Sequence, residues 1–211
     1  MLNIDIVTIV IIAANVLISM KGFNDFSFFE KYKFNIAGIR RGEQVRMFSS
    51  AFLHADYMHL FFNMLALFFF APVVIFELGV PRFVLIYVGS LIVGNLLSFY
   101  FHKEEFHYSA VGASGAVMGV LYSAILFQPN MTINFIPAWL FGILYLGYSV
   151  YGMKKRLGNI GHDAHFGGAI AGYVTTLAFD TGLLETRLWL VILLAIPIVV
   201  LFVMYKTGKI Y

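Results

Sequence analysis

The chain has 211 residues, of which 61% are hydrophobic and only 12% are charged, and its formal net charge is +3. Soluble domains carry about 25% charged residues, so this composition excludes an ordinary soluble globular protein. The absence of cysteine excludes disulfides, thiolate metal sites and cysteine nucleophiles. The basic residues are spread over the loops without aromatic interleaving, so nothing in the sequence supports nucleic-acid binding.

Long hydrophobic segments recur along the whole chain. A helix that spans a bilayer needs about 20 apolar residues, and backbone polar groups in lipid must be paired within the segment. No Asp, Glu, Lys or Arg occurs from Phe106 to Met153, a tract long enough for two spans with a turn at 128–130. We therefore predict an all-α multi-pass membrane protein. The expected helices lie at about 4–20, 58–76, 83–101, 112–127, 135–151, 164–180 and 188–205.

The connection over residues 21–57 is the only long one. It contains the stretch FNDFSFFEKYKFNI and carries six Lys or Arg residues. This segment is too hydrophobic for a disordered linker, so we expect it to fold against the helices or to lie in the membrane interface.

Histidine side chains converge on one side of the predicted bundle. In an alternating bundle, the starts of even-numbered helices and the ends of odd-numbered helices lie on the same side of the membrane. All six histidines and one glycine-flanked serine fall on that side, which indicates a site there. These residues are His54, His59, His102, His107, Ser114, His162 and His165.

Ser114 stands between Gly112 and Gly115 at the start of the fourth predicted helix. The unpaired N–H groups of a first helical turn, together with the helix dipole, favour an anion. An anion is what the tetrahedral intermediate of acyl transfer presents, and the glycines leave room for a peptide backbone. The alternative is a serine that packs in a small-residue helix interface, to which Gly115 and Gly119 are equally suited.

His165 opens the sixth predicted helix and is a candidate base for a serine nucleophile. Gly168 and Gly172 follow at a four-residue spacing that lets two helices pack closely. Packed against Gly115 and Gly119, they would bring a Ser–His hydrogen bond within reach. The alternative is a histidine that pairs with an interfacial carbonyl.

The second predicted helix supplies His59 and Asn63, which are four residues apart and share one helix face. An imidazole and an amide on one face are able to donate hydrogen bonds to an oxyanion. His54 lies outside that face, where it is suited to bracing the preceding loop. An ordinary interhelical hydrogen bond is the alternative for Asn63.

Two other classes of protein use overlapping residues. A metal-dependent membrane hydrolase would use imidazole and carboxylate ligands, but HADYMH is not HExxH and has no Glu between its histidines. A transporter would use Asn15, Asn95 and Asp180, yet no carboxylate pair or broken-helix repeat is visible at mid-membrane. The candidate metal ligands are His54, Asp56, His59, His162, Asp163 and His165.

Three ordered motifs resemble the rhomboid family of intramembrane serine proteases. They are VRMFSSAFLHADYMHLFFNM at 45–64, GASGAVMG at 112–119 and HDAHFGGAIAGY at 162–173. The family pattern has a GxSG serine on the fourth helix, a histidine with GxxxG on the sixth, and HxxxxHxxxN on the second. Arg46 and the triplet 77–79 also resemble family positions of structural importance.

The resemblance implies a Ser114–His165 dyad without an acid. In that case His59, Asn63 and the backbone N–H of Ser114 would line the oxyanion hole, and neither metal nor cofactor is expected. The implied partners are transmembrane protein substrates and the lipid bilayer, and the implied location is a bacterial plasma membrane. A catalytically inactive rhomboid-like binding protein is the alternative.

The resemblance also implies a core of six helices. We expect a single membrane-embedded protease domain over 1–211, with its core at 4–181 and one additional C-terminal helix at about 188–205. Many rhomboids have an aromatic residue four positions after the serine, where this chain has Met118. A thioether still contacts a ring, so we expect His165 to be held less firmly, and Met118→Tyr or Met118→Phe to change activity.

Charge and resemblance disagree about the orientation in the membrane. Loops on the serine side hold 12 Lys and Arg residues, and the other side holds only Arg82 and Arg187. The positive-inside rule therefore places the serine side in the cytoplasm. Bacterial rhomboids usually open to the outside, and we follow the family because the first loop folds near the interface.

Overall fold

The structure is a computed structural model that describes residues 4–155 and 161–210. The predicted all-α multi-pass fold is confirmed, and within these described residues seven long helices lie close to the predicted segments. They are α1 (Ile6–Asn24), α5 (Tyr57–Leu78), α6 (Val80–His102), α7 (Ser114–Phe127), α8 (Ala138–Lys155), α9 (His162–Phe179) and α11 (Leu188–Lys206).

The fifth predicted segment begins later than expected. Residues 132–137 form a small hairpin of β3 (Thr132–Ile133) and β4 (Ile136–Pro137), which pair antiparallel. Asn134 and Phe135 turn the hairpin with φ values of 47° and 68°. An apolar run alone does not distinguish this extended segment from the first turn of a helix.

In the part of the chain that the structure describes, the four helices α1, α5, α6 and α11 are long and apolar enough to cross a membrane. The helix α7 is apolar but has only 14 residues. Glycine, tyrosine and histidine lower the mean hydropathy of α8 and α9, which have 18 residues each.

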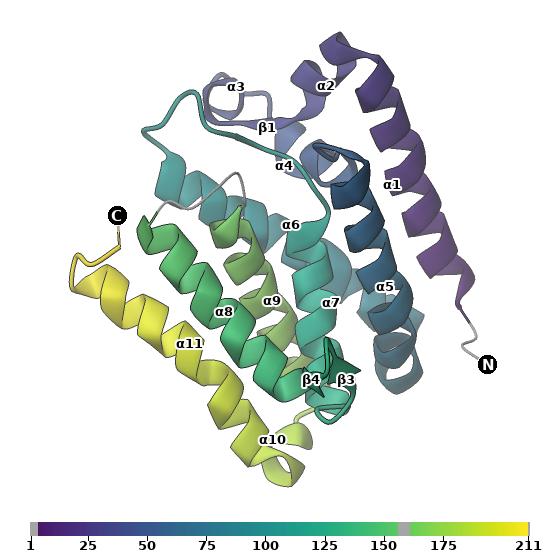
Figure 1. Ribbon diagram of the computed structural model, residues 1–211, viewed down its shortest axis with the longest axis vertical. Coiled ribbons are helices and arrows are strands. Elements are labelled where there is room, and N and C mark those ends of the chain that lie inside the picture. The colour runs from purple at the N-terminus through teal and green to yellow at the C-terminus, as the bar shows by residue number, and fades with distance from the viewer. Residues whose placement is uncertain (1–3, 156–160, 211) are drawn as a thin grey trace.

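The helix α7 occupies the middle of the bundle, and every one of its residues after Ser114 is buried. Figure 1 shows α5 and then α1 on one side of α7, and α8 and then α11 on the other. The helix α9 packs extensively against both α6 and α7. The first turn of α7 lies at the end of the bundle that carries the first loop, and the β3–β4 hairpin lies at the opposite end (Figure 1).

Glycines allow α7 and α9 to approach until their backbones touch. A side chain at Gly168 would overlap the carbonyl group of Gly115, and one at Gly172 would overlap the carbonyl oxygen of Gly119. The contact therefore requires glycine on α9, and it sets the distance between the N-terminal turns of the two helices.

The first loop is folded rather than extended. It contains the short helices α2 (Phe26–Tyr32), α3 (Ile36–Arg40) and α4 (Arg46–Ser49) and the 3-10 helix η1 (Ser50–Phe52). Its strand β1 (Phe34–Asn35) pairs antiparallel with β2 (Ser109–Ala110) from the loop between α6 and α7. Another short helix, α10 (Leu183–Thr186), lies in the loop that joins α9 to α11. The pairing of β1 with β2 fastens the first loop beside the segment that leads to Ser114.

Candidate active site

Ser114 and His165 are in direct contact. Ser114 is the first residue of α7, His165 lies in the first turn of α9, and the distance from Ser114 Oγ to His165 Nε2 is 2.6 Å. His165 is buried and Ser114 is half-buried. The close packing of the two helices therefore joins a hydroxyl to a ring nitrogen in a site shielded from bulk water.

Gly112 shapes the approach to the serine. Its φ of +127° lies in the region that favours glycine. A Cβ at this position would lie 2.6 Å from His59 Cε1 and 3.7 Å from Ser114 Oγ. The glycine thus lets the His59 ring lie against the backbone beside the serine.

His54 holds the loop before α7 in place by hydrogen bonds. Its Nδ1 lies 2.8 Å from the hydroxyl of Ser19, and its Nε2 accepts from the backbone N–H of Ala113 at 3.4 Å. The Ser19 hydroxyl donates to the carbonyl of Phe52, so Nδ1 of His54 carries the proton. Burial lowers the pKa of His54 to about 3, which keeps the ring neutral in this role.

His59 and Asn63 lie on one face of α5, as their spacing predicts. The N–H of Ala55 donates to His59 Nδ1 at 3.4 Å, which leaves the proton on Nε2, toward Gly112. The amide of Asn63 donates one hydrogen to the His59 carbonyl at 2.9 Å. A side-chain amide has two hydrogens to donate, so Asn63 and His59 each retain one hydrogen-bond donor.

Sequence reasoning missed Tyr145. Its hydroxyl, on α8, lies 2.9 Å from Nδ1 of His165, and the two rings are 5.9 Å apart between centroids. The tyrosines of α8 recur every three residues, at 145, 148 and 151, which places hydroxyls along one side of the helix. That spacing was the available signal.

The remaining histidines share the same end of the bundle but not the same contacts. His102 lies 3.4 Å from a carboxylate oxygen of Asp163 and stacks on Tyr108. His107 is exposed, and His162 packs against the backbone of α8 at Gly152. The six histidines therefore lie at one end of the bundle but in several separate environments.

The candidate metal ligands are not assembled into one centre. Among residues 4–155 and 161–210, no three or more His, Asp or Glu side chains lie where they could hold one ion. Both ring nitrogens of His54 and of His165 already face protein hydrogen-bond partners.

Met118, the residue four positions after Ser114, is buried within α7.

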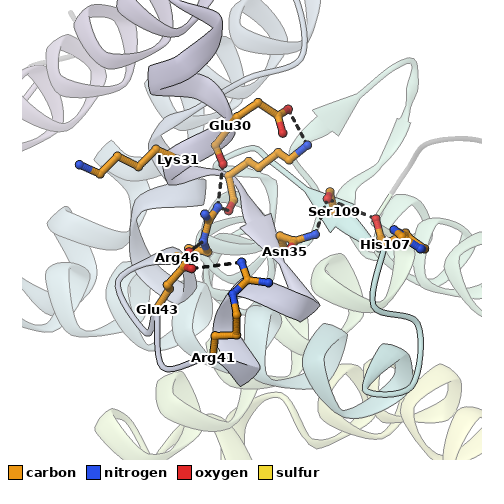
Figure 2. A pocket seen from close by; sticks show the side chains of 9 residues that line it. Glu30, Lys31, Asn35, Arg41, Glu43, Arg46, His107 and Ser109 are labelled. Carbon is orange, nitrogen blue, oxygen red and sulfur yellow. Dashed lines mark hydrogen bonds and ion pairs between the residues drawn. The ribbon is translucent and has the colours of Figure 1, made fainter.

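A hollow of about 720 Å³ lies beside the first loop, and Ser114 is not among the residues that line it. Figure 2 shows Arg46 among the residues that line the hollow; its side chain is only 10% exposed and contacts Glu43. Arg46 also donates to the backbone carbonyls of Glu30 at 2.7 Å and Lys33 at 3.0 Å. One buried cation thereby holds three points of the first loop together.

Arg46→Ala is expected to lower the stability of the protein by about 2 kcal/mol, because it leaves two partly buried backbone carbonyls without this donor. Thermal unfolding in detergent measures this, and Arg41→Ala, at a side chain that is 65% exposed, is the matched control with an expected change within about 0.5 kcal/mol. Equal melting temperatures for both variants would contradict the stabilising role of Arg46 in the first loop.

The same contacts predict a pH dependence. Hydrogen bonds from Arg46 and then Arg41 hold the pKa of Glu43 below its usual value. A lowered pKa in the folded state stabilises the protein above the unfolded pKa, and this stabilisation is lost as the pH falls through the folded value. Acidification should therefore narrow the difference in melting temperature between wild type and Arg46→Ala.

Comparison with known proteins identifies relatives of this chain. A family model described as the Rhomboid domain matches residues 41–180. The rhomboid-family protein YdcA of Bacillus subtilis is 42% identical over 91 residues, which cover 43% of this chain and 44% of that protein. The rhomboid protease GluP of the same organism is 31% identical over 140 residues, which cover 66% of this chain and 27% of GluP.

Mitochondrial proteins are also similar. Rhomboid protein 1 of Saccharomyces cerevisiae is 30% identical over 138 residues, which cover 61% of this chain and 40% of the yeast protein. The chain therefore spans less than half the length of each of these three relatives.

Proposed function

This chain belongs to the rhomboid family, and we propose that it is an intramembrane serine endopeptidase in which Ser114 is the nucleophile and His165 the base. The observation that carries the proposal is the 2.6 Å contact between Ser114 Oγ and His165 Nε2 at the buried end of two tightly packed helices. A nucleophile within hydrogen-bond reach of a base, itself held by a third group, is the arrangement that covalent catalysis requires.

The proposed reaction proceeds through an acyl-enzyme. His165 Nε2 takes the proton of Ser114 as Oγ attacks the carbonyl carbon of the substrate, and then gives that proton to the leaving amine. A water molecule attacks the ester in the second half, with His165 again as base. The proton returns to Ser114 Oγ, and the products are a carboxylic acid and an amine.

The proposal also assigns hydrogen-bond donors to the oxyanion of the tetrahedral intermediate. The N–H groups of the first turn of α7 have no partner within the helix, and the positive end of the helix dipole lies at Ser114. In the proposal, His59 Nε2–H and the second amide hydrogen of Asn63 add to these donors. Removing a single donor of this kind from such a site costs about 100- to 1,000-fold in rate.

Substrates are proposed to be transmembrane segments of membrane proteins that approach between α5 and α8. The helix α5 packs on α6 and α7, and α8 packs on α9 and α11, whereas α5 and α8 share no extensive contact in the described part of the chain. These two helices flank α7 in Figure 1. A segment that unwinds there would meet Ser114 without passing through the bundle.

In the proposal, residues 1–211 act as one domain, and the protein lies in a bacterial plasma membrane.

A serine-directed fluorophosphonate probe tests the proposal. Labelling of the purified protein in detergent is expected for wild type and lost in both Ser114→Ala and His165→Ala, because each removes one half of the dyad. Labelling is expected to be the same with and without EDTA. Labelling that survives Ser114→Ala, or that EDTA abolishes, would contradict the proposal and favour a metal-dependent hydrolase.

An inactive rhomboid-like binding protein is the second candidate, since members of one fold family need not share an activity. In that case folded wild type would neither label nor cleave any transmembrane substrate. The short Ser114–His165 distance favours the active alternative.

A further inference from the structure

We propose that Tyr145 is a positioning residue for His165, so that a Ser–His–Tyr chain of hydrogen bonds operates here. This inference rests on the proposed function. Its first support is geometric, because His165 has Ser114 Oγ at 2.6 Å from Nε2 and the Tyr145 hydroxyl at 2.9 Å from Nδ1. Ser114, His165 and Tyr145 come from α7, α9 and α8, so the two hydrogen bonds join three helices at the level of the serine.

The second support is the demand that the reaction makes on the ring. When His165 takes the proton from Ser114, both ring nitrogens carry hydrogen, and the new cation lies in a site where the histidine is only 7% exposed. A buried N–H without an acceptor is costly. In the proposal, the Tyr145 oxygen, 2.9 Å from Nδ1, accepts the hydrogen of that nitrogen. A hydrogen bond donated from Nδ1 also selects the tautomer in which Nε2 is free to act as the base.

The nearest carboxylate on the same helix does not serve this purpose. Asp163, two residues before His165, directs its carboxylate to His102 Nε2 at 3.4 Å. A neutral phenol therefore occupies the place that a carboxylate holds in a Ser–His–Asp triad.

The third support concerns the packing around the His165 ring. The residue four positions after Ser114 is Met118, which has no ring, and the aromatic neighbour of His165 comes instead from α8. Tyr145 is half-buried, and its ring is inclined by 34° to the imidazole. The helix α8 thus both limits rotation of the imidazole and supplies its acceptor.

The test compares Tyr145→Phe with wild type on a fluorescent transmembrane peptide substrate. Loss of one hydrogen bond that orients a base is expected to lower kcat about tenfold and to leave KM within about twofold. Tyr151→Phe, on the same helix and exposed, is the matched control and should retain wild-type kcat. Thermal unfolding of each variant shows whether it is folded.

A spectroscopic measurement separates positioning from a general structural role. In protein with ¹⁵N-labelled histidine, the His165 signals, identified by their loss in His165→Gln, should report a protonated Nδ1 in wild type. In folded Tyr145→Phe they should change toward the other tautomer. In addition, 3-fluorotyrosine at position 145 has a more weakly accepting oxygen, so it should give a kcat between those of wild type and Tyr145→Phe.

The outcomes are distinguishable. If wild type reacts with the serine-directed probe but Tyr145→Phe retains both its kcat and the wild-type His165 signals, the inference is wrong and the proposed function stands. A 3-fluorotyrosine protein that is faster than wild type would show that Tyr145 donates to Nδ1, which also overturns the inference. If wild type shows neither labelling nor cleavage, the proposed function fails, and the inference fails with it.

Discussion

Ser114→Ala is expected to lower the rate of cleavage of a transmembrane substrate by at least about a thousandfold, because it removes the atom that forms the acyl-enzyme. The small side chain fits the same space at the start of α7, so the fold should be retained. Initial rates measured in detergent and in lipid nanodiscs, with melting temperatures of both proteins, provide the comparison.

The double variant Ser114→Ala/His165→Ala tests whether Ser114 and His165 act together as a dyad. Residues that act as a unit in catalysis have effects that do not add, so the double variant should be no slower than Ser114→Ala alone. A further drop of the size caused by His165→Ala in wild type would mean that His165 acts independently of Ser114.

Gly168→Ala is expected to lower cleavage about 100-fold and to destabilise the fold by about 1–3 kcal/mol. The added methyl group would overlap the backbone carbonyl of Gly115, and backbone cannot turn aside as a flexible side chain does. Overpacking of a dense interior has a cost of this size, and a displacement of about 1 Å between reacting groups costs about 100-fold in rate. Melting temperature and cleavage rate measure the two effects.

Gly147→Ala is the matched control on α8. A Cβ at Gly147 meets no atom within 4 Å, so this change should leave the rate unaltered and stabilise the helix by up to about 1 kcal/mol. If Gly168→Ala behaved like Gly147→Ala, the backbone contact between α7 and α9 would not set the position of Ser114.

Much of the fold follows from the sequence, because membrane spans and alternating topology are strong constraints. Hydrophobic length predicts the seven long helices, and the small residues of α7 and α9 predict their close packing. The same alternation places Ser114 and His165 at one end of the bundle. The roles of the site residues stay predictions until the variants are measured.

The contacts that sequence reasoning did not find depend on three-dimensional detail. Tyr145 was not distinguished from the other tyrosines of α8, because only the rotation of that helix about its axis decides which hydroxyl faces His165. The pairing of β1 with β2 joins two-residue strands far apart in the chain, and strands of that length leave no periodic pattern. The division of the histidines into separate environments likewise depends on neighbours such as Tyr108 that no local motif specifies.

The shortness of α7 has a consequence for what the protein would be able to cut. Its 14 residues span about 21 Å at 1.5 Å per residue, whereas the hydrocarbon layer is about 30 Å thick. The far end of α7 leads to a hollow whose lining includes Arg187 and Trp189, and tryptophan is enriched at the membrane–water boundary. If that end of α7 lies at one surface of the membrane, Ser114 at the other end would lie inside the hydrocarbon layer, about 21 Å from that surface. With Ser114 as the nucleophile, a substrate would be selected by the depth of its unwound bond as well as by the residues around that bond.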